Sequence, residues 1–353
     1  MNKNIIVLTG VTGQDGSHMV DFLLKETDYH IVGCVRRLSV PNDENIIEHV
    51  AHPRFEKVYF DLTDSTSVNQ IVKKYQPAYF INFAAQSFVG ASWDIPVATW
   101  NCTATGVLNI LEAIRTESPS TKFYNAGSSE EFGDVQYSPQ DEKHPLRPRS
   151  PYGAAKAAAR HLVKVYRESY NLFAVQGWLF NHEGTRRGEE FVTRKITKSV
   201  ALIRKALDEG RVPPPMQLGN LESKRDWGDS EDFIRAVWLM MQQDRPRDYV
   251  VASGATHSIR EFVEASFKSA GIEIQPTGND ITSDVLTVAY TLKGDEKTPL
   301  VYVNPKYFRP AEVQLLLGDP TLIEKELGWK RESSFEKLVD KMTQHDILAL
   351  SKF

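Results

Sequence analysis

The amino-acid sequence predicts an α/β protein built on a doubly wound parallel sheet, followed by a smaller mixed α/β domain. Three observations predict this fold. Short β-rich runs alternate with helix-sized segments over the first half of the chain, which is typical of βαβ units. These runs are apolar throughout, as expected of strands buried on both faces. A glycine-rich turn directly follows the first run, which makes the expected sheet Rossmann-type.

The first half of the chain supplies the strands and helices of this sheet. Apolar runs predict strands over residues 5–9, 30–36, 58–61, 79–83, 122–126 and 173–179. Helical patterns between them predict helices over residues 19–25, 68–75 and 103–115. A longer helix is expected to begin near Pro151, because proline suits the first helical position and Ser150 is suited to cap it.

The pattern changes after about residue 183. Amphipathic segments predict helices over residues 191–207, 233–242 and 259–270, with a proline-rich break at 212–215. The stretch 278–305 is polar and weakly patterned, and 320–346 has a helical pattern. At roughly 150 residues per domain, 353 residues predict about two domains. We expect a dinucleotide-binding domain over residues 1–183 and a mainly substrate-binding domain over 184–353, with some crossing of the chain back to the first.

The composition excludes several functional classes. Hydrophobic residues make up 41% and charged residues 25%, which is typical of folded globular proteins. A net charge of -4 provides no global field for nucleic acid or an anionic membrane, so neither is an expected partner. Cys34 and Cys102 lie in apolar runs, and we expect neither a disulfide framework nor a metal site. No signal peptide or membrane span is predicted, which indicates a cytoplasmic protein.

The glycine turn is the first candidate binding site. Glycines in such a turn let backbone N–H groups approach a pyrophosphate at the N-terminus of a helix, although glycines also form ordinary strand-to-helix turns. The residues of the turn that we expect to contact a dinucleotide are Gly10, Thr12, Gly13, Gln14, Asp15 and Gly16.

The ends of the next strands supply further cofactor candidates. Where an NAD-specific fold places an acidic residue on the ribose 2′-hydroxyl, this chain has Arg36 and Arg37, which fit a 2′-phosphate and favour NADP. The two arginines also suit a solvated turn or a contact between subunits. The third and fourth strands end in residues that suit either cofactor contact or simple packing, namely Asp61, Leu62, Phe83, Ala84, Ala85, Gln86 and Ser87.

Tyr152 and Lys156 form a candidate catalytic pair. Their spacing of four residues puts both side chains on one face of the predicted helix. A nearby ammonium lowers the pKa of a phenol toward a value useful for general-base catalysis, and the same lysine can bind the ribose of a nicotinamide cofactor. Such a pair also occurs by chance on exposed helices.

Ser128 and Glu130 lie just after the strand predicted over residues 122–126, at the edge of the sheet where ligands bind in open α/β folds. Ser128 is placed to hydrogen-bond a substrate hydroxyl. Reduction of a ketone needs only a hydroxyl, a tyrosine and a lysine, whereas an added carboxylate can remove a carbon-bound proton beside a carbonyl. Glu130 therefore indicates elimination, and the alternative is that Glu130 or Glu131 caps a turn in solvent.

With these motifs in hand, the chain resembles the GDP-mannose 4,6-dehydratases, nucleotide-sugar-modifying members of the extended short-chain dehydrogenase/reductase family. The spacing of the glycine turn is that of the extended family. The resemblance covers nearly the whole chain, and its specific motifs are Ser150-Pro-Tyr-Gly-Ala-Ala-Lys156, Leu179-Phe-Asn-His-Glu183, Arg186-Arg-Gly188, Phe191-Val-Thr-Arg-Lys195, Lys224-Arg-Asp-Trp-Gly228 and Tyr307-Phe-Arg-Pro-Ala-Glu-Val313.

The resemblance implies an NADP-dependent lyase that dehydrates GDP-mannose, the first step toward deoxyhexoses such as GDP-fucose. It implies an active site of Ser128, Glu130, Tyr152 and Lys156, with Ser129 beside them. His182 and Arg187 would join the cofactor site. The sugar-nucleotide contacts implied are Ser87, Ser128, Ser129, Glu130, Asn181, Val192, Lys195, Arg225, Arg309 and Glu312. A homotetramer, or a homodimer, is implied, in which residues 36–42 reach a neighbouring subunit.

The charges of the second half fit this substrate. A net negative protein must concentrate cations locally to hold a diphosphate, for which Arg194, Lys195, Arg225 and Arg309 are candidates. The alternative is that Arg225 and Arg309 form structural ion pairs with Asp226 and Glu312.

Two departures from the family pattern bear on specificity. Ser128 stands where the family usually has threonine, and it keeps the hydroxyl but loses the methyl group that restricts its rotamer. Glu131 stands in place of an apolar residue. A GDP-heptose 4,6-dehydratase and a nucleotide-sugar 4-epimerase or reductase therefore stay as alternatives. A non-enzymatic Rossmann protein would predict a damaged site or a basic face, and the sequence has neither.

Overall fold

The computed structural model describes residues 4–279, 284–308 and 316–351. The chain divides into two compact units, each assembled from three separate segments. The first unit consists of residues 1–180, 230–254 and 317–330, and the second of residues 181–229, 255–316 and 331–353. Each unit therefore depends on residues that are far apart in the sequence.

The first unit is built on a sheet of seven parallel strands, in the order β11-β6-β5-β4-β1-β2-β3. This architecture confirms the predicted fold class. The reversal of strand order beside β1 brings the carboxyl ends of β1 and β4 together, which is where ligands bind in doubly wound sheets. The strands are β1 (Ile5–Thr9), β2 (His30–Val35), β3 (Phe55–Tyr59), β4 (Tyr79–Asn82), β5 (Lys122–Ala126), β6 (Ala174–Leu179) and β11 (Tyr249–Val251).

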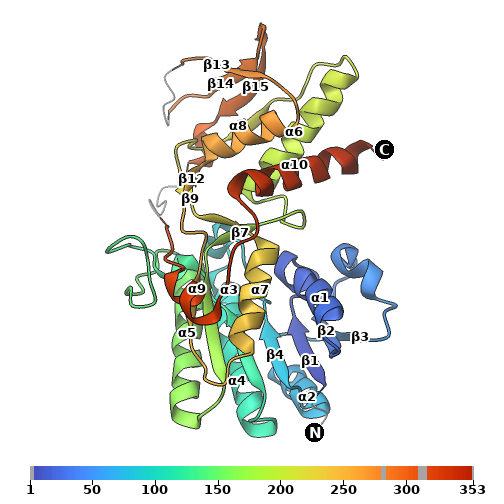
Figure 1. Cartoon of the computed structure of the whole chain (residues 1–353), viewed down its shortest axis with the longest axis vertical. Helices are drawn as coiled ribbons and strands as arrows, with labels where there is room; N and C mark the ends of the chain where they lie inside the picture. The colour runs from blue at the N-terminus through green and yellow to red at the C-terminus, as the bar shows by residue number, and fades with distance from the viewer. Residues whose placement is uncertain (1–3, 280–283, 309–315, 352–353) are drawn as a thin grey trace. The chain divides into compact units, whose positions relative to one another are not determined.

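Helices cover both faces of this sheet (Figure 1). On one face, α1 (Gln14–Glu26) and α7 (Ser230–Met241) bury Leu23 and Phe233 against the strands. The other face is covered by α2 (Ser65–Tyr75), α4 (Gly106–Glu117) and α5 (Pro151–Tyr170). Ile6 and Leu8 of β1 face the first layer, whereas Ile5 and Val7 face the second, so alternate residues of one strand fill two cores.

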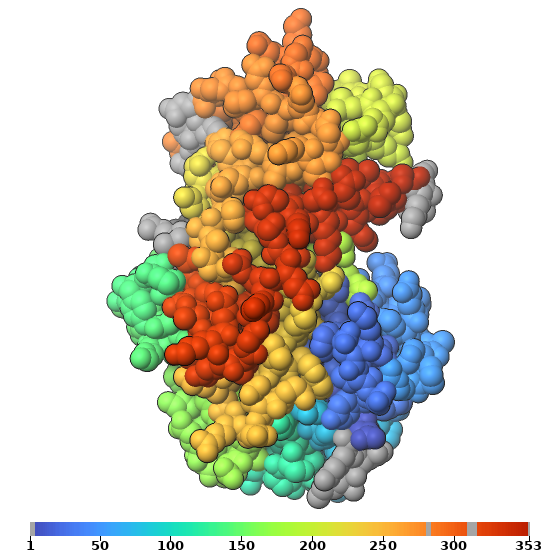
Figure 2. Space-filling view, viewed as in Figure 1, coloured from blue at the N-terminus to red at the C-terminus, as the bar shows by residue number. Residues whose placement is uncertain are grey.

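The last segment of the first unit closes the layer over α7. Helix α9 (Thr321–Leu327) packs against α7, and Figure 2 shows its red segment against the yellow one. Trp329 is buried there, and its indole Nε1 donates to the carbonyl oxygen of Asp232 at 2.9 Å. Residues near position 330 therefore complete a core that begins at Ile6.

Local sequence signals explain how several elements begin and end. The Ser150 hydroxyl accepts from the Gly153 N–H at 3.0 Å, so the predicted cap of α5 is confirmed. Asp64 caps α2 in the same way through the N–H of Thr66 at 3.0 Å. Asn171, in the left-handed region with φ 55°, ends α5.

Some predicted boundaries are wrong. The helix expected over 19–25 begins at Gln14, because the glycine turn leads into it directly. The third strand spans residues 55–59 rather than 58–61. The helix expected over 103–115 is a π-type turn at 101–105 followed by α4.

The prediction that the strands are apolar throughout is also wrong. The polar residues Thr9, Asn82, Asn125 and Gln176 are fully buried within them.

The second unit combines three helices with a four-stranded mixed sheet. Its helices are α6 (Val192–Asp208), α8 (Ile259–Ser269) and α10 (Phe335–Ser351). The sheet has the order β13-β14-β15-β8, with β13 (Ile274–Pro276), β14 (Thr287–Leu292), β15 (Asp295–Val303) and β8 (Met216–Leu218). Two short ladders join β7 (Asn181–Glu183) to β10 (Trp227–Asp229) and β9 (Lys224–Arg225) to β12 (His257–Ser258).

Two predictions for this unit are corrected. The weakly patterned stretch 278–305 contains the hairpin of β14 and β15, because its inward residues Ala289, Leu300 and Val301 are buried although its outer residues are polar. The helical region 320–346 is two helices, α9 and α10, which belong to different units and are separated by residues 328–334.

Candidate active site

The glycine turn between β1 and α1 is shaped by close backbone approach. Gly10 has φ +71°, and a Cβ atom there would lie 2.9 Å from the Ala84 backbone nitrogen. A Cβ atom on Gly16 would lie 2.2 Å from the Gly10 carbonyl oxygen. Gly13 is the N-cap of α1 and provides no side-chain cap. The start of α1 therefore presents backbone N–H groups in a cradle without side chains, which suits a pyrophosphate.

The other cofactor candidates follow the carboxyl ends of neighbouring strands. Arg36 and Arg37 follow β2 and are exposed, and the Arg37 guanidinium donates to the Leu38 carbonyl oxygen. Asp61, after β3, accepts from the backbone N–H and the hydroxyl of Thr63 at 2.8 and 2.7 Å. These residues therefore follow the carboxyl ends of parallel strands, which is where a dinucleotide binds in open α/β sheets.

The segment after β4 lies against the glycine turn. The Ala84 N–H donates to the Thr9 hydroxyl at 3.2 Å, which joins the ends of β1 and β4. Gln86 is held by its own loop, where its side chain accepts from the Phe88 N–H at 2.7 Å, and Ser87 is exposed. Leu62, after β3, is buried against Gly106 and packs rather than presenting its side chain to solvent.

Tyr152 and Lys156 occupy the first turns of α5 and are both buried. The Lys156 Nζ lies 5.8 Å from the centre of the Tyr152 ring and donates to the Ala126 carbonyl oxygen at 2.7 Å. Burial lowers the pKa of Lys156, and the negative charges of Glu131 and Asp15 partly oppose this effect. The pair thus has the geometry in which an ammonium can stabilise a neighbouring phenolate.

The turn after β5 carries Ser128 and Glu130. The Ser128 hydroxyl caps this 3-10 turn by accepting from the Glu130 N–H at 3.2 Å. A Cβ atom on Gly153 of α5 would lie 2.6 Å from the Glu130 carbonyl oxygen, so the turn packs closely on the helix that carries Tyr152. Ser129 is buried in the same turn, whereas Glu130 is partly exposed. The structure therefore brings the four expected catalytic residues onto two touching segments.

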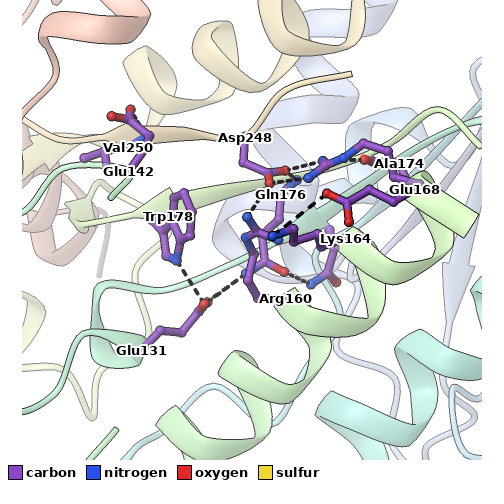
Figure 3. Close-up of polar contacts among 12 residues, drawn as sticks. Glu131, Glu142, Arg160, Lys164, Glu168, Ala174, Gln176, Trp178, Asp248 and Val250 are labelled. Atoms are coloured by element: carbon purple, nitrogen blue, oxygen red, sulfur yellow. Dashed lines mark hydrogen bonds and ion pairs between the residues drawn. The ribbon is translucent and has the colours of Figure 1, made fainter. Parts of the chain in front are cut away.

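Glu131 is the residue of this region whose setting the sequence interpretation missed. The alternative stated above was that Glu130 or Glu131 caps a turn in solvent. Glu131 does cap the turn, but its side chain is fully buried. Its carboxylate accepts from the Ser128 N–H at 2.8 Å. It also accepts from the Trp178 indole at 3.0 Å (Figure 3). Apart from that alternative, the sequence interpretation treated Glu131 only as a departure from the family pattern that bears on the sugar.

The second unit contains the other expected contacts. Asn181 and His182 lie in β7, paired with Trp227 and Gly228 of β10. Val192 begins α6, and the half-buried Lys195 holds its Nζ 4.1 Å from the centre of the Tyr307 ring. Burial lowers the pKa of Lys195.

Several arginines of this unit have structural partners. Arg187 forms an ion pair with the buried Glu183 at 3.0 Å, and Arg194 forms one with Asp346 at 2.9 Å. Both guanidinium groups are largely buried beside these carboxylates. Arg225 donates to the Lys224 carbonyl oxygen at 2.7 Å. Arg309 and Glu312 lie outside the described residues.

Neither a metal site nor a membrane span is found in the described ranges. No group of three or more His, Cys, Asp or Glu side chains in residues 4–279, 284–308 and 316–351 is arranged to hold a metal ion. In the same part of the chain, every helix is too short or too polar to cross a bilayer.

Comparisons with known proteins agree with this geometry. Residues 7–342 match the family described as GDP-mannose 4,6 dehydratase. The GDP-mannose 4,6-dehydratase of Vibrio cholerae serotype O1 is 43% identical, over 98% of this chain and 94% of that protein. The GDP-mannose 4,6 dehydratase of Homo sapiens is also 43% identical, over 98% and 92% of the two chains.

A solved structure with a similar fold is the dTDP-glucose 4,6-dehydratase of Streptomyces venezuelae in complex with NAD. Its TM-score is 0.79 at 19% identity, and the likeness covers 99% of this chain and 98% of that one. The identity to this structure supports the fold alone, whereas the family match and the relatives span the glycine turn, the catalytic segments and most of the second unit. The chain therefore belongs to the GDP-mannose 4,6-dehydratase family.

Proposed function

We propose that the protein is a hydro-lyase that converts GDP-D-mannose to GDP-4-keto-6-deoxy-D-mannose with NADP as cofactor. One observation carries the proposal: the turn with Ser128 and Glu130 packs on α5 at Gly153, beside Tyr152 and Lys156. A site with a phenol, an ammonium, a hydroxyl and a carboxylate has the groups needed for both oxidation and elimination. The family membership supports the same reaction.

The fit of the cofactor is supported by the tight turn at Gly10 and Gly16, where an added Cβ atom would clash with the backbone, and by the N-terminus of α1, which has no side-chain cap. NADP+ held beside this turn would supply the acceptor for the hydride of the sugar C4 and, once reduced, the hydride donor to C6. The guanidinium groups of Arg36 and Arg37 are suited to the 2′-phosphate, since arginine pairs with phosphate through forked donors.

The protein's own residues move the protons. Tyr152 takes the proton of the sugar O4 while C4 is oxidised, and the Lys156 ammonium stabilises the phenolate. The new C4 carbonyl acidifies the C5 hydrogen, which Glu130 removes. The C6 hydroxyl leaves as water with the proton that Tyr152 took from O4, while Ser128 or Ser129 orients the sugar. Glu130 then reprotonates C5 as hydride reaches C6, so the net change is loss of one water.

The remaining assignments belong to the same proposal. We assign the GDP-sugar to Asn181, Val192, Lys195, Arg225, Arg309 and Glu312, with Ser87, and the cofactor to His182 and Arg187 as well. For Arg187 this requires that the guanidinium bind a ligand while it keeps Glu183 as its partner. A cytoplasmic homotetramer or homodimer completes the proposal.

Mass spectrometry of a reaction with purified protein, GDP-mannose and catalytic NADP+ tests the proposal. We expect a product lighter by one water without stoichiometric NADPH. Dehydration of a GDP-heptose but not of GDP-mannose would keep the chemistry and replace the substrate. A product of unchanged mass would instead assign the chain as an epimerase. Reduction of a 4-keto sugar nucleotide by added NADPH, without loss of water from GDP-mannose, would assign it as a reductase.

A further inference from the structure

Glu131 lies in a setting that favours its ionised form. Four hydrogen bonds from three residues end on its two oxygens: Ser128 N–H at 2.8 Å, Gln176 Nε2 at 2.9 and 3.1 Å, and Trp178 Nε1 at 3.0 Å. All of these groups are donors, so a proton on the carboxyl would have to displace one of them. The donors around this fully buried side chain therefore favour the carboxylate, in opposition to burial, which favours the protonated form.

A chain of buried side chains across the sheet ends on the same carboxylate. The Thr9 hydroxyl donates to Asn82 at 2.6 Å, Asn82 donates to Asn125 at 2.9 Å, and Asn125 donates to Gln176 at 2.7 Å. Gln176 then donates to Glu131. Every bond points the same way, so the amide dipoles of three strands present their positive ends toward Glu131.

A cluster of buried charges flanks Glu131 on the other side (Figure 3). Arg160 lies 4.9 Å from the centre of the Trp178 ring and pairs with Asp248 at 2.7 Å. Asp248 also pairs with Arg167 at 2.8 Å and accepts from the Gln176 backbone N–H. Gln176 thus joins two carboxylates, one through its backbone and one through its side chain.

The charged and titratable groups that act on Glu131 are Lys156 and Arg160 of α5 and the Tyr124 hydroxyl of β5. Burial raises the pKa of Glu131 to about 7, against the effects of the Ser128 N–H, the two cations and the Trp178 indole. The buried Lys156 Nζ donates to the Ala126 carbonyl oxygen at 2.7 Å, and Glu131 accepts from the N–H of Ser128, two residues further along, at 2.8 Å. The two buried groups are therefore bound to the same short segment after β5. Among the negative groups that favour the Lys156 ammonium, Glu131 has the largest effect.

We infer that Glu131 is a positioning residue of the active site: its carboxylate fixes the turn that presents Ser128 and Glu130, and its charge keeps the buried Lys156 an ammonium. The inference rests on the function proposed above, and it adds a residue that touches neither substrate nor cofactor. It also explains why a carboxylate stands where the family usually has an apolar side chain. Glu131 acts through Ser128 on one side and through Lys156 on the other.

Two substitutions separate the two roles. Glu131→Gln keeps the length of the side chain and removes its charge, whereas Glu131→Asp keeps the charge and shortens the reach to the Ser128 N–H. We expect Glu131→Gln to lower the pKa of Lys156 by about one unit or more, because a neighbouring negative charge is lost. We expect Glu131→Asp to leave that pKa nearly unchanged while kcat falls about tenfold, because the turn is less well positioned.

The pKa of Lys156 is measured by NMR titration of protein with 13Cε-labelled lysine, using Lys156→Arg to assign the signal. This measurement needs no substrate, so it tests the inference even if the protein does not turn over GDP-mannose. Failure to turn over GDP-mannose would overturn the proposed function alone. In the active enzyme, the basic limb of the kcat profile is expected to move to lower pH in Glu131→Gln with KM little changed.

Glu142→Gln is the matched control, since the Glu142 carboxylate also accepts a backbone N–H, that of Val250, at 2.8 Å and its pKa is also raised by burial. We expect it to leave the Lys156 titration unchanged. If Glu131→Gln fails to fold, Glu131→Met removes the same charge without placing an amide donor among three donors. An unchanged Lys156 titration in a folded, uncharged variant at position 131 would overturn the inference.

Discussion

The carbonyl oxygen of Glu130 lies 2.6 Å from the point where a Cβ atom of Gly153 would stand. Gly153→Ala must therefore push the turn of Ser128 and Glu130 away from the helix that carries Tyr152. We expect kcat for dehydration to fall about tenfold or more, because a displacement of this kind misaligns the reacting groups. The overlap with backbone is also expected to lower the free energy of unfolding by about 1–3 kcal/mol, which the helix preference of alanine offsets only in part. Wild-type kcat in Gly153→Ala would contradict the proposed contact.

The glycine turn offers a second test, with Gly210 as its control. Gly10 and Gly210 have similar φ values, +71° and +66°, but only Gly10 has backbone within 4 Å of an added Cβ atom. We expect Gly210→Ala to cost about 1 kcal/mol through backbone strain. Gly10→Ala should cost more and should also weaken NADP binding. Urea unfolding and fluorescence titration with NADP measure the two effects, and equal losses in both variants would argue against the cradle.

Glu130→Gln tests the elimination step. We expect loss of dehydration by a factor of about 100 or more, because the amide cannot take the C5 proton. Cofactor binding should persist, since the glycine turn is untouched. The assay is mass spectrometry of the GDP-mannose reaction beside an NADP titration. Full activity in Glu130→Gln would rule out the assigned base.

The preference for NADP over NAD is assigned to the arginines after β2. Arg36→Ala is expected to raise the Kd for NADP about tenfold or more while the Kd for NAD changes little, because one charge-assisted contact to the 2′-phosphate is lost. Arg211→Ala is a suitable control, as Arg211 is exposed and paired with Glu209. Isothermal titration with both cofactors gives the comparison. Equal weakening for NADP and NAD would mean that Arg36 does not read the 2′-phosphate.

The pKa of Glu131 predicts a pH dependence of stability. In the folded protein the carboxyl has a pKa raised to about 7 by burial, against 4.5 as the ordinary value. Between these two pKa values the folded state holds a proton that the unfolded chain releases. The stabilisation that this proton adds to the free energy of unfolding is complete at low pH and is lost as the pH rises from about 4.5 through 7. We expect the free energy of unfolding of the wild type, relative to Glu131→Gln, to be higher at pH 5 than at pH 8. Parallel pH profiles of urea unfolding in the two proteins would contradict this expectation.

Local signals in the sequence were sufficient for much of the fold and part of the site. Ser150 and Pro151 act within a few residues of their positions, so their roles follow from local backbone geometry. The left-handed turn at Gly10 is also local, whereas its close approach to Ala84 depends on the pairing of β1 with β4. The spacing of Tyr152 and Lys156 likewise needs only the periodicity of a helix. Glu131 differs, because its partners Gln176 and Trp178 lie 45 and 47 residues away. Its burial depends on strand order, which one sequence without an alignment does not specify.

The hairpin of β14 and β15 was missed for a similar reason. Its outer residues are polar, and the pattern of buried residues is interrupted by register shifts near Tyr290 and Thr291. Gly294, with φ +83°, marks the turn between the strands and was the available signal. The division of residues 320–346 between two units also has no local signature, since Trp329 finds its place only through Asp232.

The late position of residues 317–330 has a consequence for synthesis on the ribosome. When residue 183 has been made, strands β1 to β6 are present, but α7, β11 and α9 have not yet been translated. The face of the sheet that carries Leu8 and Val175 therefore lacks part of its cover until Trp329 emerges, almost at the end of translation. The nascent chain must avoid aggregation through that apolar face for most of its synthesis. We therefore expect this enzyme to bind chaperones that act on chains before their release from the ribosome.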